Sequence, residues 1–174
     1  MKCIFTSSPI GELVLTSTEK GISFIWFVEE NGKDKLIIEL EKKFKTKLEF
    51  NSNTHLEKCK DQLQEYFIGT RKEFDLSLEL TGSEFQQKIW KLLTEIPYGK
   101  TISYLELSKK YGDVKAIRAI ASANGENPLS IIIPCHRVIG TDGSLTGYAG
   151  GLARKRWLLQ HEQDFSGNRQ EKLF

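Results

Sequence analysis

The stretch Ile131-Ile132-Ile133-Pro134-Cys135-His136-Arg137-Val138 determines how we interpret the rest of the chain. Three successive isoleucines are typical of a buried β-strand, because β-branched side chains favour extended backbone. Pro134 has no N–H to donate and a fixed φ, so strand pairing should end there. The pattern therefore predicts that Cys135 is presented at the end of a buried strand. An imidazole and a guanidinium follow the thiol, and cationic neighbours favour the reactive thiolate.

Cysteine chemistry also needs a proton acceptor and a group that orients this acceptor. His136 adjoins Cys135, but neighbours in an extended chain point to opposite sides, so a bridging water could join sulfur and imidazole. Glu162 is our candidate for orienting the imidazole, because it follows an apolar helical pattern that must pack centrally. The alternative is a buried structural cysteine beside a core histidine. Pro134, Arg137 and the apolar run favour a functional pair.

Length and composition restrict the class of protein. The 174 residues, 39% hydrophobic and 28% charged, are ordinary for a globular protein with one large or two small domains. The sequence has no run as long as a membrane span, and its polar start is unlike a signal peptide, so we expect a cytoplasmic protein. Its three cysteines are too few and too widely spaced for a disulfide framework or a cysteine-based zinc site.

The two halves of the chain differ in charge. Residues 1–81 carry 12 basic and 14 acidic side chains (net −2), and residues 82–174 carry 13 and 9 (net +4). A basic second half is weakly indicative of a polyanionic partner. The turn sequence Thr81-Gly82-Ser83 marks the expected boundary, which predicts domains over residues 1–81 and 82–174.

The first half has the pattern of a small α/β domain. Runs rich in β-branched and aromatic residues, separated by turn sequences, predict an antiparallel meander over residues 2–7, 13–18 and 22–29. Apolar residues at helical spacing predict helices over residues 34–45 and 54–67. Alternating apolar residues over 74–80 predict a fourth strand. We see no catalytic constellation here and expect a structural role.

The second half is mostly helical in pattern. Capping-box sequences begin at Ser83 and Ser103, where a side chain can bond the third helical N–H, and so predict two helix starts. Gly112 should end the second of these helices, and Asp113 can cap a third over residues 114–124. A last helix is expected over residues 152–163. Two short helices joined at a glycine are typical of a helix-turn-helix, but an ordinary helical hairpin fits this pattern equally well.

The composition of residues 114–124 favours a particular kind of DNA contact. Helices that read base sequence usually display several long polar side chains near their start, and this segment does not. Its alanines would let the helix lie close to a backbone or in a narrow groove. This predicts DNA binding with little sequence preference, with Arg118 available to enter the duplex.

The chain resembles a known family over residues 82–163. Pro134–Val138 is similar to the active-site motif of the O6-alkylguanine-DNA alkyltransferases, also called methylated-DNA–protein-cysteine methyltransferases. The following segments match that family in order: Phe85–Leu93, Ile102–Tyr104, Arg118-Ala119, Gly125-x-Asn127-Pro128, Ile133–Val138, Gly147-Tyr148-x-Gly150-Gly151-Leu152 and Trp157-Leu158-Leu159-x-His161-Glu162. The resemblance implies an α+β fold, with a ribonuclease-H-like first domain and a mostly helical second domain that carries the helix-turn-helix.

The resemblance also implies a reaction and the residues that perform it. A cysteine thiolate attacks the alkyl carbon on guanine O6 and keeps the alkyl group as a thioether, so each molecule reacts once. Cys135 would accept the alkyl group, and His136 would take its proton through a water. Glu162 would orient His136, and Asn127 would brace the turn beneath the cysteine. No cofactor or metal is implied.

Two further sets of residues follow from the resemblance. The base would leave the stack, because its O6 is unreachable inside a duplex. The pocket residues would be Val138, whose carbonyl faces the guanine amino group, Tyr148, which walls the base, and Ala149, whose N–H faces O6. The helix-turn-helix would dock in the minor groove, and the DNA-binding residues would be Tyr104, Arg118 and Thr141. Tyr104 would crowd the phosphate of the target nucleotide and assist at the base through its hydroxyl, and Arg118 would fill the space that the base leaves. The expected partner is double-stranded DNA with O6-alkylguanine, or O4-alkylthymine as a second substrate, bound by a monomer.

Some positions depart from the family pattern. Gly125 and Glu126 stand where some members carry a basic residue, and Ser130 replaces a proline found in others. Two other functions stay open on the residues alone. One is a non-catalytic protein that binds alkylated DNA, and the other is a hydrolase that uses Cys135, His136 and Glu162.

Overall fold

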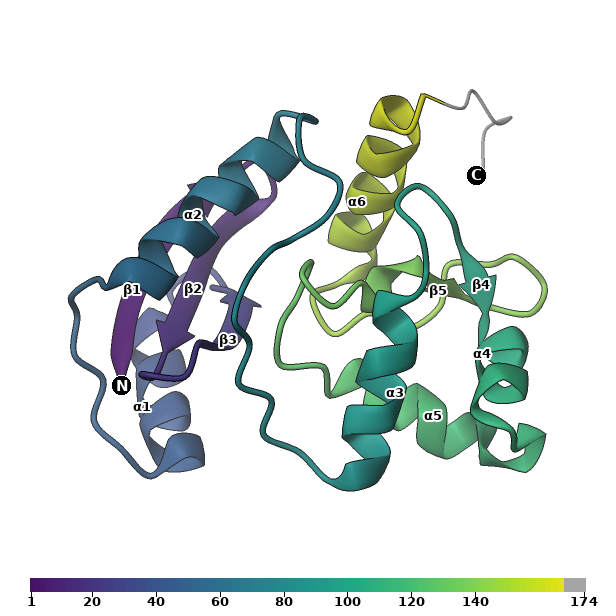
Figure 1. The fold of residues 1–174 in the computed structure, drawn as a ribbon, viewed down its shortest axis with the longest axis horizontal. Coiled ribbons are helices and arrows are strands. Elements are labelled where there is room, and N and C mark those ends of the chain that lie inside the picture. Colours follow the sequence, from purple (N-terminus) through teal and green to yellow (C-terminus); the bar gives the residue numbers. More distant parts are fainter. Residues whose placement is uncertain (168–174) are drawn as a thin grey trace. The chain divides into compact units, whose positions relative to one another are not determined.

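The structure is a computed structural model, and it describes residues 1–167. The chain divides into two compact units, Met1–Leu80 and Thr81–Phe174. Each unit has its own sheet and helices (Figure 1). The α+β fold class predicted from the sequence is confirmed.

The first unit is built on a three-stranded antiparallel sheet. Its strands β1 (Lys2–Ser8), β2 (Gly11–Ser17) and β3 (Ile22–Phe27) lie in the order β1-β2-β3, so β2 is central. Helices α1 (Lys33–Phe44) and α2 (Thr54–Phe67) follow. Both helices and all three strands lie within two residues of their predicted ends.

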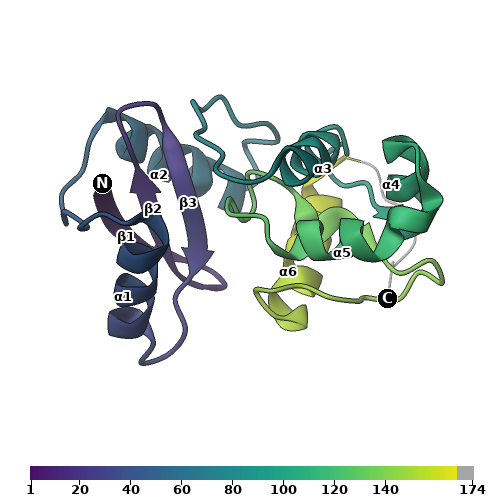
Figure 2. The same ribbon diagram turned by 90° about the horizontal axis from the view of Figure 1, so that it is seen from below.

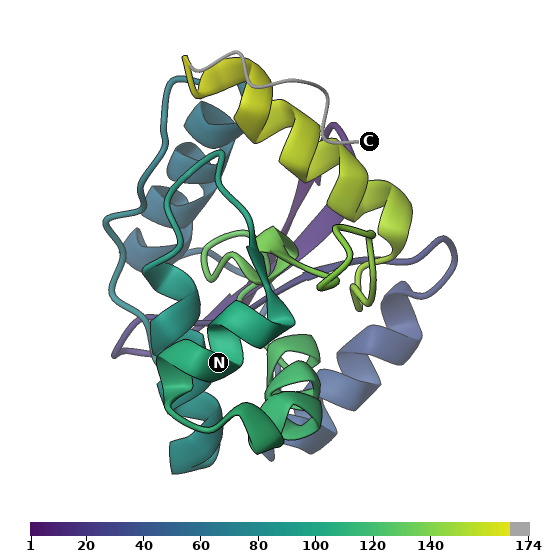
Figure 3. The ribbon, with the colours of Figure 1, turned by 90° about the vertical axis from the view of Figure 1, so that its right-hand side faces the viewer.

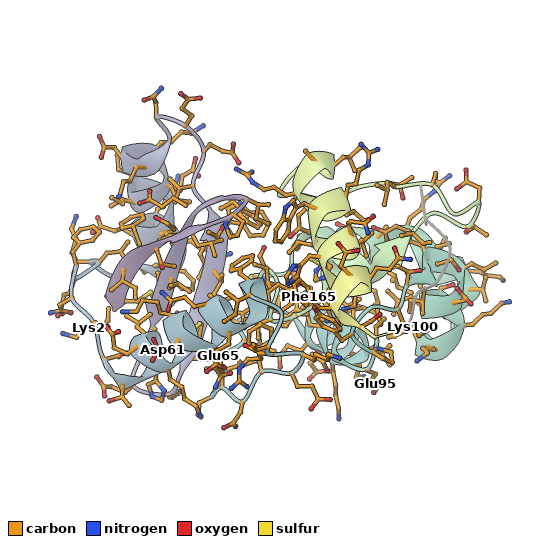
Figure 4. The ribbon with its side chains drawn as sticks, turned by 90° about the horizontal axis from the view of Figure 1, so that it is seen from above. Lys2, Asp61, Glu65, Glu95, Lys100 and Phe165 are labelled. Atoms are coloured by element: carbon orange, nitrogen blue, oxygen red, sulfur yellow. The ribbon has the colours of Figure 1, made fainter. Side chains whose placement is uncertain are left out.

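Both faces of this sheet are covered. Val14 and Phe24 pack with Leu40 of α1 in one apolar cluster. Leu13, Leu15 and their neighbours on β3 alternate to the other face and are fully buried, and α2 contacts all three strands. Figure 2 shows α1 and α2 on opposite sides of the strands. In Figure 4, Asp61 and Glu65 mark the polar side of α2, as expected for an amphipathic helix.

The prediction of a fourth strand over residues 74–80 is wrong. The segment is extended but forms only one bridge, in which Ile22 N–H donates to the Ser77 carbonyl and Glu79 N–H to the Ile22 carbonyl. Its alternating apolar residues reflect a half-buried segment that pairs in parallel with the start of β3 at one residue and does not continue along it.

The second unit is mostly helical. Its elements are α3 (Glu84–Thr94), β4 (Ile102–Ser103), α4 (Tyr104–Tyr111), the 3₁₀ turn η1 (Val114–Ala116), α5 (Ile117–Gly125), the 3₁₀ turn η2 (Cys135–Arg137), β5 (Val138–Ile139) and α6 (Leu152–Phe165). Strands β4 and β5 pair in parallel. Both predicted capping boxes, at Ser83 and Ser103, are confirmed. The helix predicted over residues 114–124 is instead a 3₁₀ turn followed by α5, and Val114, the first residue of the turn, is exposed.

The isoleucine run is buried, but it is not a strand. Ile131 has φ +75°, a left-handed conformation that is rare for a β-branched residue, and Ile133 N–H donates to the Leu129 carbonyl at 2.9 Å. The chain therefore makes a tight turn. Three adjacent apolar side chains need burial, and here a compact loop between helices buries them.

Helices surround the η2 turn that follows this loop. Both α3 and α6 contact η2. Figure 3 shows α6 on one side of the loop and α4 and α5 on the other. Among the described residues, we find no helix with the length and apolar character needed to cross a membrane.

Candidate active site

Cys135 is held in place by a series of tight turns. Pro134 has φ −82° and ψ 60°, and Cys135 N–H donates to the Ile133 carbonyl at 2.8 Å, which is an inverse γ-turn. Asn127 braces this turn, since its Nδ2 donates to the Ile133 carbonyl at 2.8 Å and to Cys135 Sγ at 3.1 Å. Its Oδ1 accepts from Leu129 N–H at 2.9 Å. Asn127 therefore contacts both the turn and the sulfur.

Four hydrogen-bond donor groups surround the buried carboxylate of Glu162. Its Oε1 lies 2.7 Å from His136 Nε2 and accepts from Arg137 Nη2 at 3.0 Å. Its Oε2 accepts from Arg137 Nε at 2.9 Å and from Gly99 N–H at 3.0 Å. Arg137 also donates to the Ile96 carbonyl. Burial alone would raise the pKa of Glu162, but the hydrogen bonds from His136 and Arg137 and the guanidinium charge outweigh it and hold this pKa well below its usual range. The carboxylate is therefore charged.

The charged carboxylate fixes the protonation state of His136. Burial lowers the pKa of His136 despite the attraction of Glu162, so the imidazole is neutral at neutral pH. An ionised carboxylate can only accept, so the single ring proton lies on Nε2. His136 Nδ1 is then a proton acceptor, and it is buried with no hydrogen-bond partner in the described part of the chain. Such an atom is suited to bind a water or to accept a proton.

The surroundings of the sulfur differ from the prediction. Cys135 is 4% exposed. Burial raises its pKa, while the Asn127 hydrogen bond and the charge of Lys155 act in the opposite direction. The expectation that His136 and Arg137 favour the thiolate is wrong, because His136 is neutral and Arg137 is paired with Glu162. In this closed site the sulfur is a thiol that needs a base.

Lys155 is a site residue that the sequence interpretation missed. It is fully buried on α6, and its Nζ donates at 2.6 Å to the carbonyls of Val138 and of Thr146, with the Gly147 carbonyl at 3.4 Å. Burial lowers its pKa to about 8. Lys155 lies two helical turns before Glu162, on the same helix face, so a lysine within the apolar stripe was the signal that could have revealed it.

A cavity of about 500 Å³ adjoins Thr146 and Gly147, whose carbonyls lie next to Lys155 Nζ. It is lined by Tyr104, Ala121, Gly125, Thr146, Gly147, Tyr148 and Ala149. The volume lies within the range of small-molecule sites and would hold a purine base. The pKa values of Tyr104 and Tyr148 are raised, first by burial and then by the charge of Cys135, so both phenols lie near the sulfur.

The structure brings most of the predicted site residues together. Cys135, His136, Glu162, Asn127 and Val138 form one buried cluster, and Tyr104, Tyr148 and Ala149 line the cavity. Two others lie apart from it. Arg118 is exposed on α5, and Thr141 is exposed in the turn after β5. The geometry does not bring these two residues to the sulfur.

We expect Gly99→Ala to disturb the Glu162 cluster. Gly99 has φ +71°, and an added Cβ would lie 2.7 Å from Ser166 Cβ and 3.2 Å from the Glu162 carbonyl. Backbone strain and overpacking should together lower the free energy of unfolding by about 2–4 kcal/mol, measured by chemical denaturation. Gly112→Ala is a matched control, because Gly112 also has positive φ (+97°) but open space around it. Equal losses for the two variants would contradict the packing explanation.

Family comparisons cover almost the whole chain. A family model described as the ribonuclease-like domain of 6-O-methylguanine DNA methyltransferase matches residues 1–80. A second model, described as the DNA binding domain of 6-O-methylguanine DNA methyltransferase, matches residues 84–164.

Individual relatives agree with this. The chain is 44% identical over 155 residues to a methylated-DNA–protein-cysteine methyltransferase of Methanosarcina acetivorans, covering 89% of this chain and 94% of the relative. It is 41% identical over 157 residues to the constitutive enzyme of that name in Bacillus subtilis, covering 90% and 92%. A crystal structure of Mycobacterium tuberculosis OGT in complex with DNA is similar with a TM-score of 0.80 and 39% identity, covering 95% of this chain and 94% of that one.

Proposed function

The chain belongs to the 6-O-methylguanine DNA methyltransferase family, and from this premise we propose that it repairs DNA by transferring the alkyl group of O6-alkylguanine to Cys135. The observation that carries the proposal is the buried cluster at the sulfur. Asn127 bonds Cys135 Sγ, a buried Glu162–His136 pair offers a proton acceptor, and a cavity that would hold a purine is lined by Tyr104 and Tyr148, on which the charge of Cys135 acts.

The reaction is a direct displacement. The sulfur of Cys135 forms a bond to the alkyl carbon as the bond between that carbon and O6 breaks, and the electron pair stays on guanine. The thiol proton passes through a water to His136 Nδ1. The departing guanine anion takes up one proton, so one proton is given up and one is taken up in each reaction. Because the product is a thioether, which is a poor leaving group, each chain reacts once. Glu162 stabilises His136 as it becomes positive.

The cavity residues would hold the base. The Ala149 N–H faces O6, where negative charge grows, and Tyr148 walls the ring. The Val138 carbonyl already accepts a hydrogen bond from Lys155 Nζ, so its second lone pair is the one available to the guanine amino group. Lys155 thus ties the base-reading carbonyl to the loop that carries Gly147.

Helices α4 and α5 would bind the DNA. Arg118, Ala119 and Ser122 are exposed on α5, and α5 also contributes Ala121 and Gly125 to the cavity lining. A small-residue helix can lie close to the backbone in the minor groove and bind any sequence. The lesion is rotated out of the stack into the cavity, and Arg118 fills the space it leaves. We assign Thr141 to a contact with the DNA backbone.

Arg118→Ala should separate base rotation from chemistry. We expect the second-order rate on duplex DNA with O6-methylguanine to fall about 10-fold or more, since rotating a base out costs a few kcal/mol. The rate on a free O6-alkylguanine base should change less than about twofold, because the side chain is exposed on α5 and is not part of the buried cluster. Equal losses on the two substrates would contradict this role.

A titration tests the proposed function itself. Increasing amounts of duplex DNA with one O6-methylguanine are added to a fixed amount of protein, and the repaired fraction is measured. We expect one lesion repaired per chain and then no further repair. Continued turnover would favour the cysteine hydrolase, and binding without repair would favour a non-catalytic DNA-binding protein.

We assign the activity to a monomer in the cytoplasm. Cys135 and the residues that line the cavity all belong to one chain, so a single copy can complete the transfer. A reducing compartment keeps such a thiol available, and the three cysteines are free in the structure. O4-alkylthymine is assigned as a second substrate, because its alkyl group is bonded to an exocyclic oxygen in the same way.

A further inference from the structure

A buried amide on α5 plays no part in the mechanism described so far. Asn124 is 2% exposed in the last turn of the helix. Its Nδ2 donates to the Tyr104 hydroxyl at 3.2 Å, and its Oδ1 is buried with no hydrogen-bond partner among the described residues. A buried amide that is half unpaired costs stability, whereas an apolar side chain here would not. Asn124 therefore needs a reason other than packing.

The direction of the hydrogen bond between Asn124 and Tyr104 supplies such a reason. An amide nitrogen can only donate, so the Tyr104 oxygen accepts from Asn124 and its own proton is directed elsewhere. Tyr104 and Gly147 both line the cavity. The Tyr104 hydroxyl lies close to Gly147, since a Cβ added to this glycine would be 3.7 Å from the hydroxyl oxygen. The phenol proton is therefore available to an acceptor inside the cavity.

Accepting one hydrogen bond also makes the phenol a better donor, because linked hydrogen bonds polarise one another. Burial and the charge of Cys135 raise the pKa of Tyr104, and the Asn124 hydrogen bond acts in the opposite direction. The same amide thus directs the proton and makes it easier to share.

We propose that Asn124 is a positioning residue that aims the Tyr104 hydroxyl proton at the alkylated purine and strengthens its hydrogen bond to that base. The inference rests on the proposed function. As the bond from O6 to the alkyl carbon breaks, electron density grows on the purine ring, and a hydrogen bond from Tyr104 stabilises this charge. No proton is consumed at Tyr104, because the thiol proton balances the one that guanine gains.

The test is a double-mutant cycle on the single-turnover rate at saturating protein, so that DNA affinity does not enter. Asn124→Leu should slow methyl transfer from duplex DNA about tenfold, the size of one hydrogen bond, when Tyr104 is present. In a Tyr104→Phe background the same change should slow it less than about twofold. Asn124→Asp should cost at least as much as Asn124→Leu, because a carboxylate would accept the phenol proton instead of directing it to the base.

Gln62→Leu is the matched control. Gln62 is a buried amide in the first unit that bonds the backbone of Asp75, so its loss should lower stability without changing the rate. Thermal unfolding of each variant checks its fold, and the leucine pair decides the outcome if the aspartate variant does not fold.

The outcomes separate this inference from the proposed function. A wild-type rate in Asn124→Asp, or an undiminished Asn124→Leu effect in the Tyr104→Phe background, would overturn the role of Asn124 alone. A wild-type protein that takes up no methyl group would overturn the proposed function and the inference together.

Discussion

Replacing Glu162 with glutamine should lower the free energy of unfolding by about 3–5 kcal/mol and slow alkyl transfer by roughly 10²-fold or more. The carboxylate accepts from His136, Arg137 and Gly99 within a fully buried site. A glutamine keeps the shape but removes the charge and turns N–H groups towards the guanidinium. Arg137 is then a buried cation without its counter-ion, and the His136 tautomer is no longer fixed.

The pH dependence of this loss follows from the pKa of Glu162. The pKa is lower in the folded protein than the ordinary value of 4.5, so the contribution of Glu162 to stability is fully present above 4.5 and is lost as the pH falls below it. Denaturation of wild type and Glu162→Gln should therefore differ most at neutral pH and converge in acid. Asp164→Asn, a change at an exposed position on the same helix, is the control and should have little effect. A difference that is constant down to acid pH would contradict the charged cluster.

Lys155→Met should slow alkyl transfer at least about tenfold at neutral pH, because each unit of thiol pKa changes the thiolate fraction tenfold. The variant removes a buried cation whose charge lowers the pKa of Cys135. It also leaves the carbonyls of Val138 and Thr146 without their donor, so the cavity wall loses an anchor. The measurement is the rate on a free O6-alkylguanine base, where DNA contacts play no part.

A pH series identifies the charge as the cause. The pKa of Lys155 is about 8, so the wild-type ammonium is lost as the pH rises through that value. The ratio of wild-type to Lys155→Met rates should be largest below pH 8 and shrink above it. Arg156→Met removes an exposed cation from the same helix and should change the rate less than about twofold. A ratio that does not change with pH would assign the whole effect to packing.

Local patterns were sufficient to predict most of the helices and three strands. The Ser83 and Ser103 capping boxes are short-range signals, and both predicted helix starts are correct. The strand predicted from the isoleucine run was wrong. β-branched residues indicate burial and extended backbone together, and here the residues are buried but the backbone is not extended. The positive φ of Ile131 depends on surrounding contacts, such as the bond from Ile133 N–H to the Leu129 carbonyl, that a propensity cannot reveal.

The site was predictable as a set of residues but not as an arrangement of charges. Cys135, His136 and Glu162 could be singled out from the motif and from the apolar helix. Arg137 pairs with Glu162, 25 positions away, so its guanidinium does not act on the sulfur. Lys155 is instead the cation whose charge lowers the pKa of Cys135. Such an exchange of partners depends on how α6 packs on the η2 turn, which is a tertiary contact.

Peptide mapping of the alkylated protein tests the central claim most directly. The protein is incubated with duplex DNA that carries a labelled O6-methyl group, then digested, and the label is located by mass spectrometry. We expect one methyl group per chain, on the peptide that contains Cys135, with guanine restored in the DNA and no label in Cys135→Ser. Label on Cys3, Cys59 or any other residue, or label retained in Cys135→Ser, would contradict the account.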